Sequence, residues 1–100
     1  MSILSDIINE EYERLIRTIK SYEQIVSELP KGSIMIKNIG GRRYQYLQWR
    51  LGEKVKSKYI KPEYADEISE KISQRRYYEK ELKEMYRSRK EFERIIGKEL

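Results

Sequence analysis

The sequence predicts an α+β fold: two long helices in an antiparallel coiled-coil-like hairpin, with a three-stranded antiparallel β-meander inserted between them. Apolar residues recur every three or four positions in the first and last thirds of the chain. In the middle third they recur at every second position, and glycine or proline separates the three segments. One hundred residues lead us to expect a single domain over residues 1–100.

The first segment predicts a helix over residues 4–29. From Tyr12 onward its apolar residues are spaced 3, 4, 3, 4 and 3, a heptad pattern that packs against another helix. We expect Ser5 to be the N-cap and Pro30 with Gly32 to end the helix. The stripe consists of Leu4, Ile8, Tyr12, Leu15, Ile19, Tyr22, Val26 and Leu29.

The middle segment, residues 33–60, predicts three short strands. They are rich in β-branched and aromatic residues and are separated by glycines. The expected strands are 33–38, 42–50 and 54–60. A two-residue hairpin turn at Leu51–Gly52 would place Tyr46 opposite Ser57.

Strand alternation then divides the side chains between two faces. One face consists mostly of Tyr44, Tyr46, Gln48, Val55, Ser57 and Tyr59. The other consists of Arg43, Gln45, Leu47, Trp49, Lys54, Lys56 and Lys58. Two arrangements stay open: Trp49 and Leu47 pack on the helices and leave the tyrosines exposed, or the tyrosines pack and leave Trp49 available to a ligand.

The third segment predicts a helix over residues 62–96. Pro62 suits a first-turn position, and acidic residues follow it closely. Arg75 and Arg89 interrupt the apolar stripe, and Gly97 is a natural end. A helix of this length extends far beyond a three-stranded sheet, so we expect its distal half to pack on the first helix.

A two-helix hairpin buries little surface, which leads us to expect a homodimer. The residues expected to mediate dimerisation are Tyr12, Leu15, Ile19, Tyr22, Val26, Leu82, Met85 and Phe92.

The excess positive charge lies in the middle of the chain. The net charge is +5 overall, but residues 31–61 contain nine basic residues and a single acidic one, Glu53, for a net charge of +8. Such segregation indicates an anionic partner for this segment, unless the basic residues only solubilise the sheet edges.

Composition excludes several kinds of chemistry. The chain has no Cys and no His, so disulfides, thiol nucleophiles, Cys/His zinc sites and imidazole acid–base catalysis are ruled out. We therefore expect no enzyme activity, no metal and no cofactor. No apolar run is long enough to span a membrane, and acidic residues stand near the N-terminus, so we expect a cytoplasmic protein.

The stretch KGSIMIKNIGGRRYQYLQWRLGEKVKSKYI, residues 31–60, carries two resemblances. It resembles the core of small uncharacterised bacterial and archaeal helix–sheet–helix proteins, which implies no biochemical role. Residues 32–75 also loosely resemble the arm-type DNA-binding domain of tyrosine-recombinase integrases, whose three-stranded sheet enters the major groove. This resemblance implies DNA contacts by Arg43, Gln45, Lys54, Lys56 and Lys58. The long first helix departs from it, and no recombinase catalytic domain follows within the chain.

The leading hypothesis is therefore an accessory or regulatory protein that binds nucleic acid through its basic sheet, with double-stranded DNA favoured. The expected contact residues are Arg42, Arg43, Gln45, Trp49, Arg50, Lys54, Lys56 and Lys58. Basic side chains neutralise phosphates, and Arg and Gln can read base edges. The alternative is a coiled-coil adaptor or inhibitor, such as one encoded by a mobile element, whose basic sheet docks on an acidic protein surface.

Overall fold

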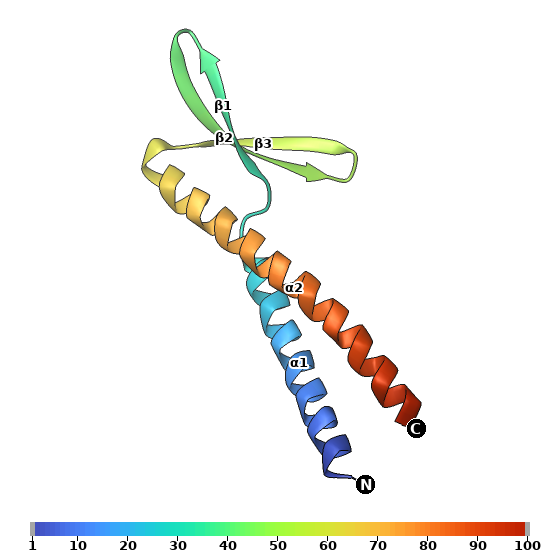
Figure 1. The fold of residues 1–100 in the computed structure, drawn as a ribbon. Coiled ribbons are helices and arrows are strands. Elements are labelled where there is room, and N and C mark those ends of the chain that lie inside the picture. The colour runs from blue at the N-terminus through green and yellow to red at the C-terminus, as the bar shows by residue number, and fades with distance from the viewer. Residues whose placement is uncertain (1, 100) are drawn as a thin grey trace. The chain divides into compact units, whose positions relative to one another are not determined.

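The structure, a computed structural model, describes residues 2–99, with side chains described for residues 2–97 (Figure 1). Its elements are helix α1 (Ile3–Glu28), strands β1 (Ser33–Ile39), β2 (Arg42–Leu51) and β3 (Lys54–Ile60), the 3-10 turn η1 (Pro62–Tyr64) and helix α2 (Ala65–Glu99). The strands form one antiparallel sheet in the order β1-β2-β3. The predicted α+β class, with a helix on each side of a meander in the chain order, is confirmed.

Two compact units make up the chain. The helix pair consists of α1 and the part of α2 from Tyr77 onward, and the sheet unit consists of Leu29–Arg76. Helix α2 contributes residues to both units. Each unit is described by itself below.

Helix α1 begins two residues before the serine expected to cap it. The Ser5 amide lies inside the helix and donates a hydrogen bond to Ser2 Oγ at 3.1 Å, and the Asp6 amide donates to the Ser2 carbonyl at 3.2 Å. Ser5 is therefore not the N-cap, because Ser2 already accepts from the first free amides of the helix. The other end lies at Glu28, one residue before the expected boundary, in accord with the constraint that Pro30 imposes on Leu29.

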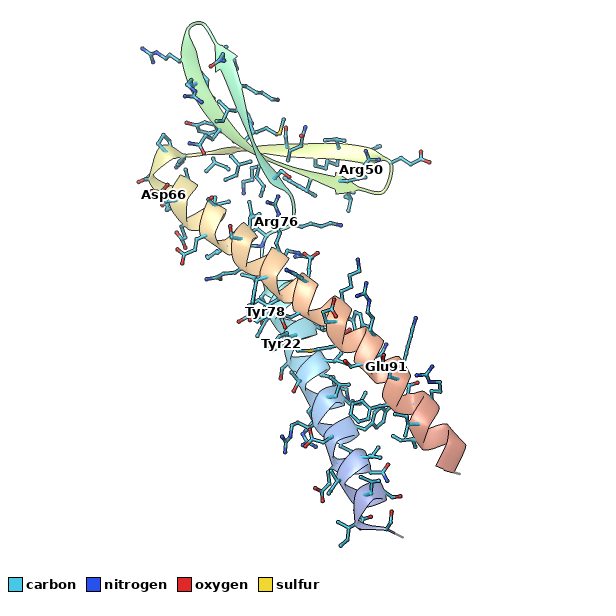
Figure 2. All side chains as sticks on the ribbon, viewed as in Figure 1. Tyr22, Arg50, Asp66, Arg76, Tyr78 and Glu91 are labelled. Carbon is cyan, nitrogen blue, oxygen red and sulfur yellow. The ribbon has the colours of Figure 1, made fainter. Side chains whose placement is uncertain are left out.

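In the helix pair, the heptad stripe of α1 packs on α2. Ile19 and Leu82 are buried, with exposed fractions of 2% and 5%, and burying side chains of this size stabilises a fold by about 1.5–3 kcal/mol each. Two pairs of aromatic rings also join the helices. The rings of Tyr12 and Phe92 lie 6.2 Å apart. Those of Tyr22 and Tyr78, which Figure 2 labels, lie 5.0 Å apart, edge to face. Since early residues of α1 contact late residues of α2, the two helices are antiparallel.

Pro62 starts the third segment as expected, but it does so in a 3-10 turn. The Tyr64 amide donates to the Lys61 carbonyl at 2.9 Å, and the α-helix proper begins at Ala65. At the other end the prediction was wrong, because α2 continues through Gly97 to Glu99. A glycine ends a helix where its backbone turns left-handed, and Gly97 has no positive φ.

The turn of the second hairpin corrects the expected strand register, whereas the first hairpin turns at its glycines. Gly40 and Gly41, with φ of 59° and 80°, close the first hairpin, as a type I′ turn requires. The second turn is Gly52–Glu53, not Leu51–Gly52, and Leu51 pairs with Lys54. The reason is that the first turn residue takes a positive φ, 63° at Gly52, which leucine would adopt only with strain.

Because the turn lies one residue later than expected, each β3 partner shifts by two positions, and Tyr46 stands opposite Tyr59 instead of Ser57. A shift of two positions leaves the predicted division into faces intact. The tyrosine face consists of Ser33, Met35, Lys37, Ile39, Arg42, Tyr44, Tyr46, Gln48, Arg50, Val55, Ser57 and Tyr59. The tryptophan face consists of Ile34, Ile36, Asn38, Arg43, Gln45, Leu47, Trp49, Leu51, Lys54, Lys56, Lys58 and Ile60.

The core of the sheet unit lies on its tryptophan face. Ile60 of this face is 3% exposed, and the first turns of α2 contribute the buried Ala65 and Ile72. Ile34 of the same face and Ile72 line one hollow of about 260 Å³. Of the two arrangements that the sequence left open, the structure therefore has the tryptophan face packed on the helix.

Two arginines of α2 hold the segment that leads into β1. Arg75 donates a hydrogen bond to the carbonyl of Leu29, and Arg76 donates to Ser33 Oγ at 3.4 Å and to the Gly32 carbonyl at 3.5 Å. Arg75, which interrupts the apolar stripe in the sequence, thus fixes the end of the loop that follows α1.

Candidate nucleic-acid interface

The eight residues predicted to contact nucleic acid are divided between the two faces of the sheet. Arg42 and Arg50 belong to the tyrosine face, at opposite ends of β2. The other six, Arg43, Gln45, Trp49, Lys54, Lys56 and Lys58, belong to the tryptophan face. No single flat surface can therefore use all eight, and the two faces need separate consideration.

The lysine row of β3, Lys54, Lys56 and Lys58, is the most regular cationic feature. The three side chains are exposed and lie on an edge strand, about 6.6 Å apart along it. Their partners on β2 are Leu51, Trp49 and Leu47. The row therefore borders the apolar part of the tryptophan face and stays in solvent, where its charges can meet an anion.

Arg43 and Gln45 differ in accessibility. Arg43 is exposed and pairs with Asn38 close to the first hairpin turn. Gln45 is half-buried between Ile36 and the buried Ile60. Arg43 is therefore open to a ligand, whereas Gln45 borders the core.

Trp49 is half-buried next to the point where the backbone at Gly32 passes close to strand β2. Gly32, with φ of 121°, passes so near β2 that a Cβ atom there would lie 2.2 Å from the Gln48 carbonyl oxygen and 3.0 Å from Trp49 Cβ. This packing favours a structural role for Trp49 over the alternative in which it is available to a ligand.

The prediction of contact residues did not include the tyrosines. On the tyrosine face, Tyr59 lies edge-on to Tyr46 at 5.7 Å and to Tyr44 at 6.2 Å between ring centroids. Lys37 Nζ lies 4.6 Å from the centroid of the Tyr46 ring. The signal was present in the sequence as alternating tyrosines, but tyrosine stripes usually pack. Which face is covered is shown by the structure, where Ile60 of the tryptophan face is buried.

The charged side chains on both faces of the sheet are all positive. Seven basic side chains stand on the strands, and no Asp or Glu does, because Glu53 lies in the second turn. All seven, Lys37, Arg42, Arg43, Arg50, Lys54, Lys56 and Lys58, are exposed. The sheet is thus a cationic surface on both sides.

The residues expected to mediate dimerisation lie in the helix pair, where the chain's own second helix already contacts several of them. Ile19 and Leu82 are buried there. Leu15 and Phe92 line one hollow, and Val26 and Met85 are half-buried. Tyr12 and Tyr22 make the ring contacts described above. Among the described side chains of this unit, the large apolar ones that stay exposed are instead Ile3, Leu4, Ile7, Tyr77 and Ile95.

Over the residues that the structure describes, no helix is long and apolar enough to cross a lipid bilayer.

The comparison with known families assigns the chain to a family but gives no function. No curated protein and no solved structure matches the sequence. Residues 5–70 match the family described as a domain of unknown function, DUF6788. The match covers most of α1, the whole sheet and the first turns of α2. The chain therefore belongs to the DUF6788 family.

Proposed function

We propose that the sheet unit binds nucleic acid, with double-stranded DNA as its target. The observation that carries the proposal is the set of seven exposed basic side chains on three strands without a single carboxylate among them. Cations in such a concentration neutralise phosphates and release counterions, which is the main source of affinity for DNA.

The lysine row supports a duplex as the target. An edge strand with three evenly spaced ammonium groups can follow a phosphate backbone, and a two-stranded ribbon such as β2–β3 fits the major groove. Arg43, exposed on the same face, is the candidate for reading base edges. The resemblance of residues 32–75 to arm-type DNA-binding domains points to the same class of partner.

The salt dependence of duplex binding tests this proposal. The slope of log affinity against log salt changes by about 0.9 for each phosphate that the protein ceases to neutralise. Replacing Lys54, Lys56 and Lys58 together by alanine should flatten the slope by about 2.7 and weaken all duplex sequences alike. The matched control is Lys80→Ala, Lys83→Ala and Lys90→Ala, a triple change of exposed lysines on α2.

Equal effects of the two triple variants would show that net charge, and not the lysine row, determines binding. If a folded protein failed to bind duplex, single-stranded DNA and RNA at about 50 mM salt, the proposal would fall. An acidic protein surface would then be the partner to seek, and the lysine row should govern that interaction instead.

We also propose that the chain forms a homodimer through the helix pair. Ile3, Leu4 and Ile7 lie within the first two turns of α1 and Ile95 lies near the end of α2, all of them exposed. In the helix pair, the start of α1 and the end of α2 lie at the same end (Figure 1). A second copy would cover this apolar end, as in a four-helix bundle.

A further inference from the structure

The three tyrosines of the tyrosine face form a cluster that the sheet holds in place. Tyr59 on β3 contacts Tyr44 and Tyr46 on β2, with ring planes inclined at 60° and 64°. Edge-to-face packing of this kind fixes the rings relative to one another at little cost in side-chain entropy. The cluster is therefore a preformed aromatic surface.

The tyrosine cluster is open to solvent. The exposed fraction of Tyr59 is 45%, and Met35 and Val55, elsewhere on the same face, are 43% and 54% exposed. Tyr44 and Tyr46 are half-buried. The core of the sheet unit lies on the other face, so these rings are not needed to cover Ile60 or Ile72.

Three cations share this face with the cluster. Lys37 lies over the Tyr46 ring, and Arg42 and Arg50 stand at the two ends of β2, about 26 Å apart along the strand. Arg50 lies beside the second hairpin (Figure 2). Because no carboxylate is present on this face, all three charges are available to an anionic ligand.

This combination of rings and charges selects one kind of occupant. A second copy of the same face would bring three cations against three cations, which is unfavourable. An apolar protein surface would leave the cations without counter-charges. A single-stranded nucleic acid offers both required chemistries, since its phosphates pair with Lys and Arg while its unpaired bases stack on aromatic rings. In a duplex the bases are already stacked on one another and do not reach the rings.

We propose that the tyrosine face binds single-stranded nucleic acid by stacking unpaired bases on Tyr46 and Tyr59, with Lys37, Arg42 and Arg50 holding the backbone. The inference rests on the proposed function, because it assigns a second nucleic-acid surface to the same sheet unit. A protein of this kind would hold duplex along the lysine row and a neighbouring unpaired segment on the opposite face, as at a junction or a DNA end.

The test compares single-stranded and duplex oligonucleotides of about 12 nucleotides by fluorescence anisotropy, using the full chain. Tyr59→Leu and Tyr46→Leu should each weaken single-strand binding by about 5- to 150-fold, the amount that base stacking contributes. Duplex affinity should change by less than about twofold. Tyr59→Phe keeps the ring and should bind single strands like the wild type. Tyr77→Leu, an exposed tyrosine in the helix pair, is the matched control.

A second measurement locates the bound strand directly. Single-stranded DNA that contains 5-bromouracil is irradiated in the complex, and the adducts are mapped by mass spectrometry. We expect adducts on Tyr46 or Tyr59. Adducts confined to the tryptophan face or to the helix pair would overturn the inference, even if a tyrosine variant failed to fold.

The experiments distinguish a failure of the proposed function from a failure of this inference alone. If neither duplex nor single strand binds, the proposed function fails, and this inference falls with it. If duplex binds through the lysine row but the tyrosine variants leave single-strand binding unchanged, the inference alone is wrong. It is also wrong if Tyr59→Leu changes the oligomeric state and not the single-strand affinity, since the face would then be a protein interface.

Discussion

Tyr86 and Glu23 form a hydrogen bond across the helix pair. Tyr86 Oη donates to Glu23 Oε2 at 2.7 Å, and the Arg89 guanidinium lies 5.0 Å from the centroid of the Tyr86 ring. This hydrogen bond is the main cause that raises the pKa of Tyr86 above 10.0, and burial and the negative charge of Glu23 add to it, while Arg89 acts in the opposite direction. Ionising the phenol would remove the donor and place two negative charges together.

The raised pKa of Tyr86 predicts a loss of stability at high pH. Because the pKa is higher in the folded chain than in the unfolded chain, the contribution is complete below about pH 10 and is lost as the pH rises through the folded value. Tyr86→Phe should lower the free energy of unfolding by about 1 kcal/mol or less at neutral pH. That difference from wild type should shrink above about pH 10.

The measurement is urea unfolding, followed by circular dichroism, at about pH 8 and about pH 11. Tyr77→Phe on the same helix is the matched control. If both variants showed the same pH dependence, the Tyr86–Glu23 hydrogen bond would not be its cause.

Replacing glycine by alanine should have opposite effects on stability at Gly32 and at Gly97. At Gly32 a Cβ would lie 2.2 Å from the Gln48 carbonyl oxygen, and φ is 121°, so Gly32→Ala should destabilise the sheet unit by about 2 kcal/mol or more. At Gly97 a Cβ meets open space in the last turn of α2, so Gly97→Ala should stabilise the helix pair by about 0.5 kcal/mol, less than in a helix interior.

Two probes separate these effects. Trp49 is the single tryptophan of the chain and lies in the sheet unit, so its fluorescence reports that unit. Far-ultraviolet circular dichroism reports mainly the helices. A Gly32→Ala protein whose tryptophan transition matched the wild type would refute the proposed close approach.

At the scale of the elements, the helices and strands could be predicted because their periodicities differ. The 3, 4 spacing from Tyr12 identified α1, and alternation identified the meander. The positions of the helix ends were harder to predict, because each depends on a single capping side chain or a single backbone angle. Ser2 and Ser5 are equally good caps by residue type. Whether Gly97 ends a helix depends on its φ, which side-chain patterns do not determine.

The candidate site was predictable only in part for a related reason. Alternation divides the residues of β2 and β3 between two faces, and both faces contain cations and aromatic rings. Which face is covered depends on long-range packing: Ile60 is buried in the same unit as Ile72, and Gly32 closes on Trp49. Local spacing does not contain that information. The cationic segment was therefore found, whereas the tyrosine face was not singled out as a site.

At the scale of the whole molecule, the chain buries few large side chains. Among the described residues, the buried apolar ones are Ile19, Ile60, Ala65, Ile72 and Leu82. These five serve two units, so each unit has a small core of its own. Small cores usually need a further source of stability, and association is one.

The exposed end of the helix pair predicts how association can be disrupted. Ile7 is 50% exposed on α1, and Ile7→Asp would place a carboxylate in a dimer interface while leaving the fold of the chain intact. We expect a wild-type dimer at micromolar concentration and a monomeric variant, as measured by sedimentation equilibrium. Ile39→Asp, at an equally exposed isoleucine of the sheet unit, should stay dimeric. A wild-type mass near 12.2 kDa would contradict the dimer.

The sheet unit is continuous in sequence, whereas the helix pair is assembled from the two ends of the chain. This difference has a consequence for the order of folding. The contact between Tyr12 and Phe92 closes a loop that contains most of the chain. The entropic cost of closing a loop rises with its length. Once Leu29–Arg76 has folded through its short hairpins, that segment counts as one compact link, and the chain left to close is much shorter. The same residues that form the cationic sheet thereby lower the entropic barrier to pairing the two helices.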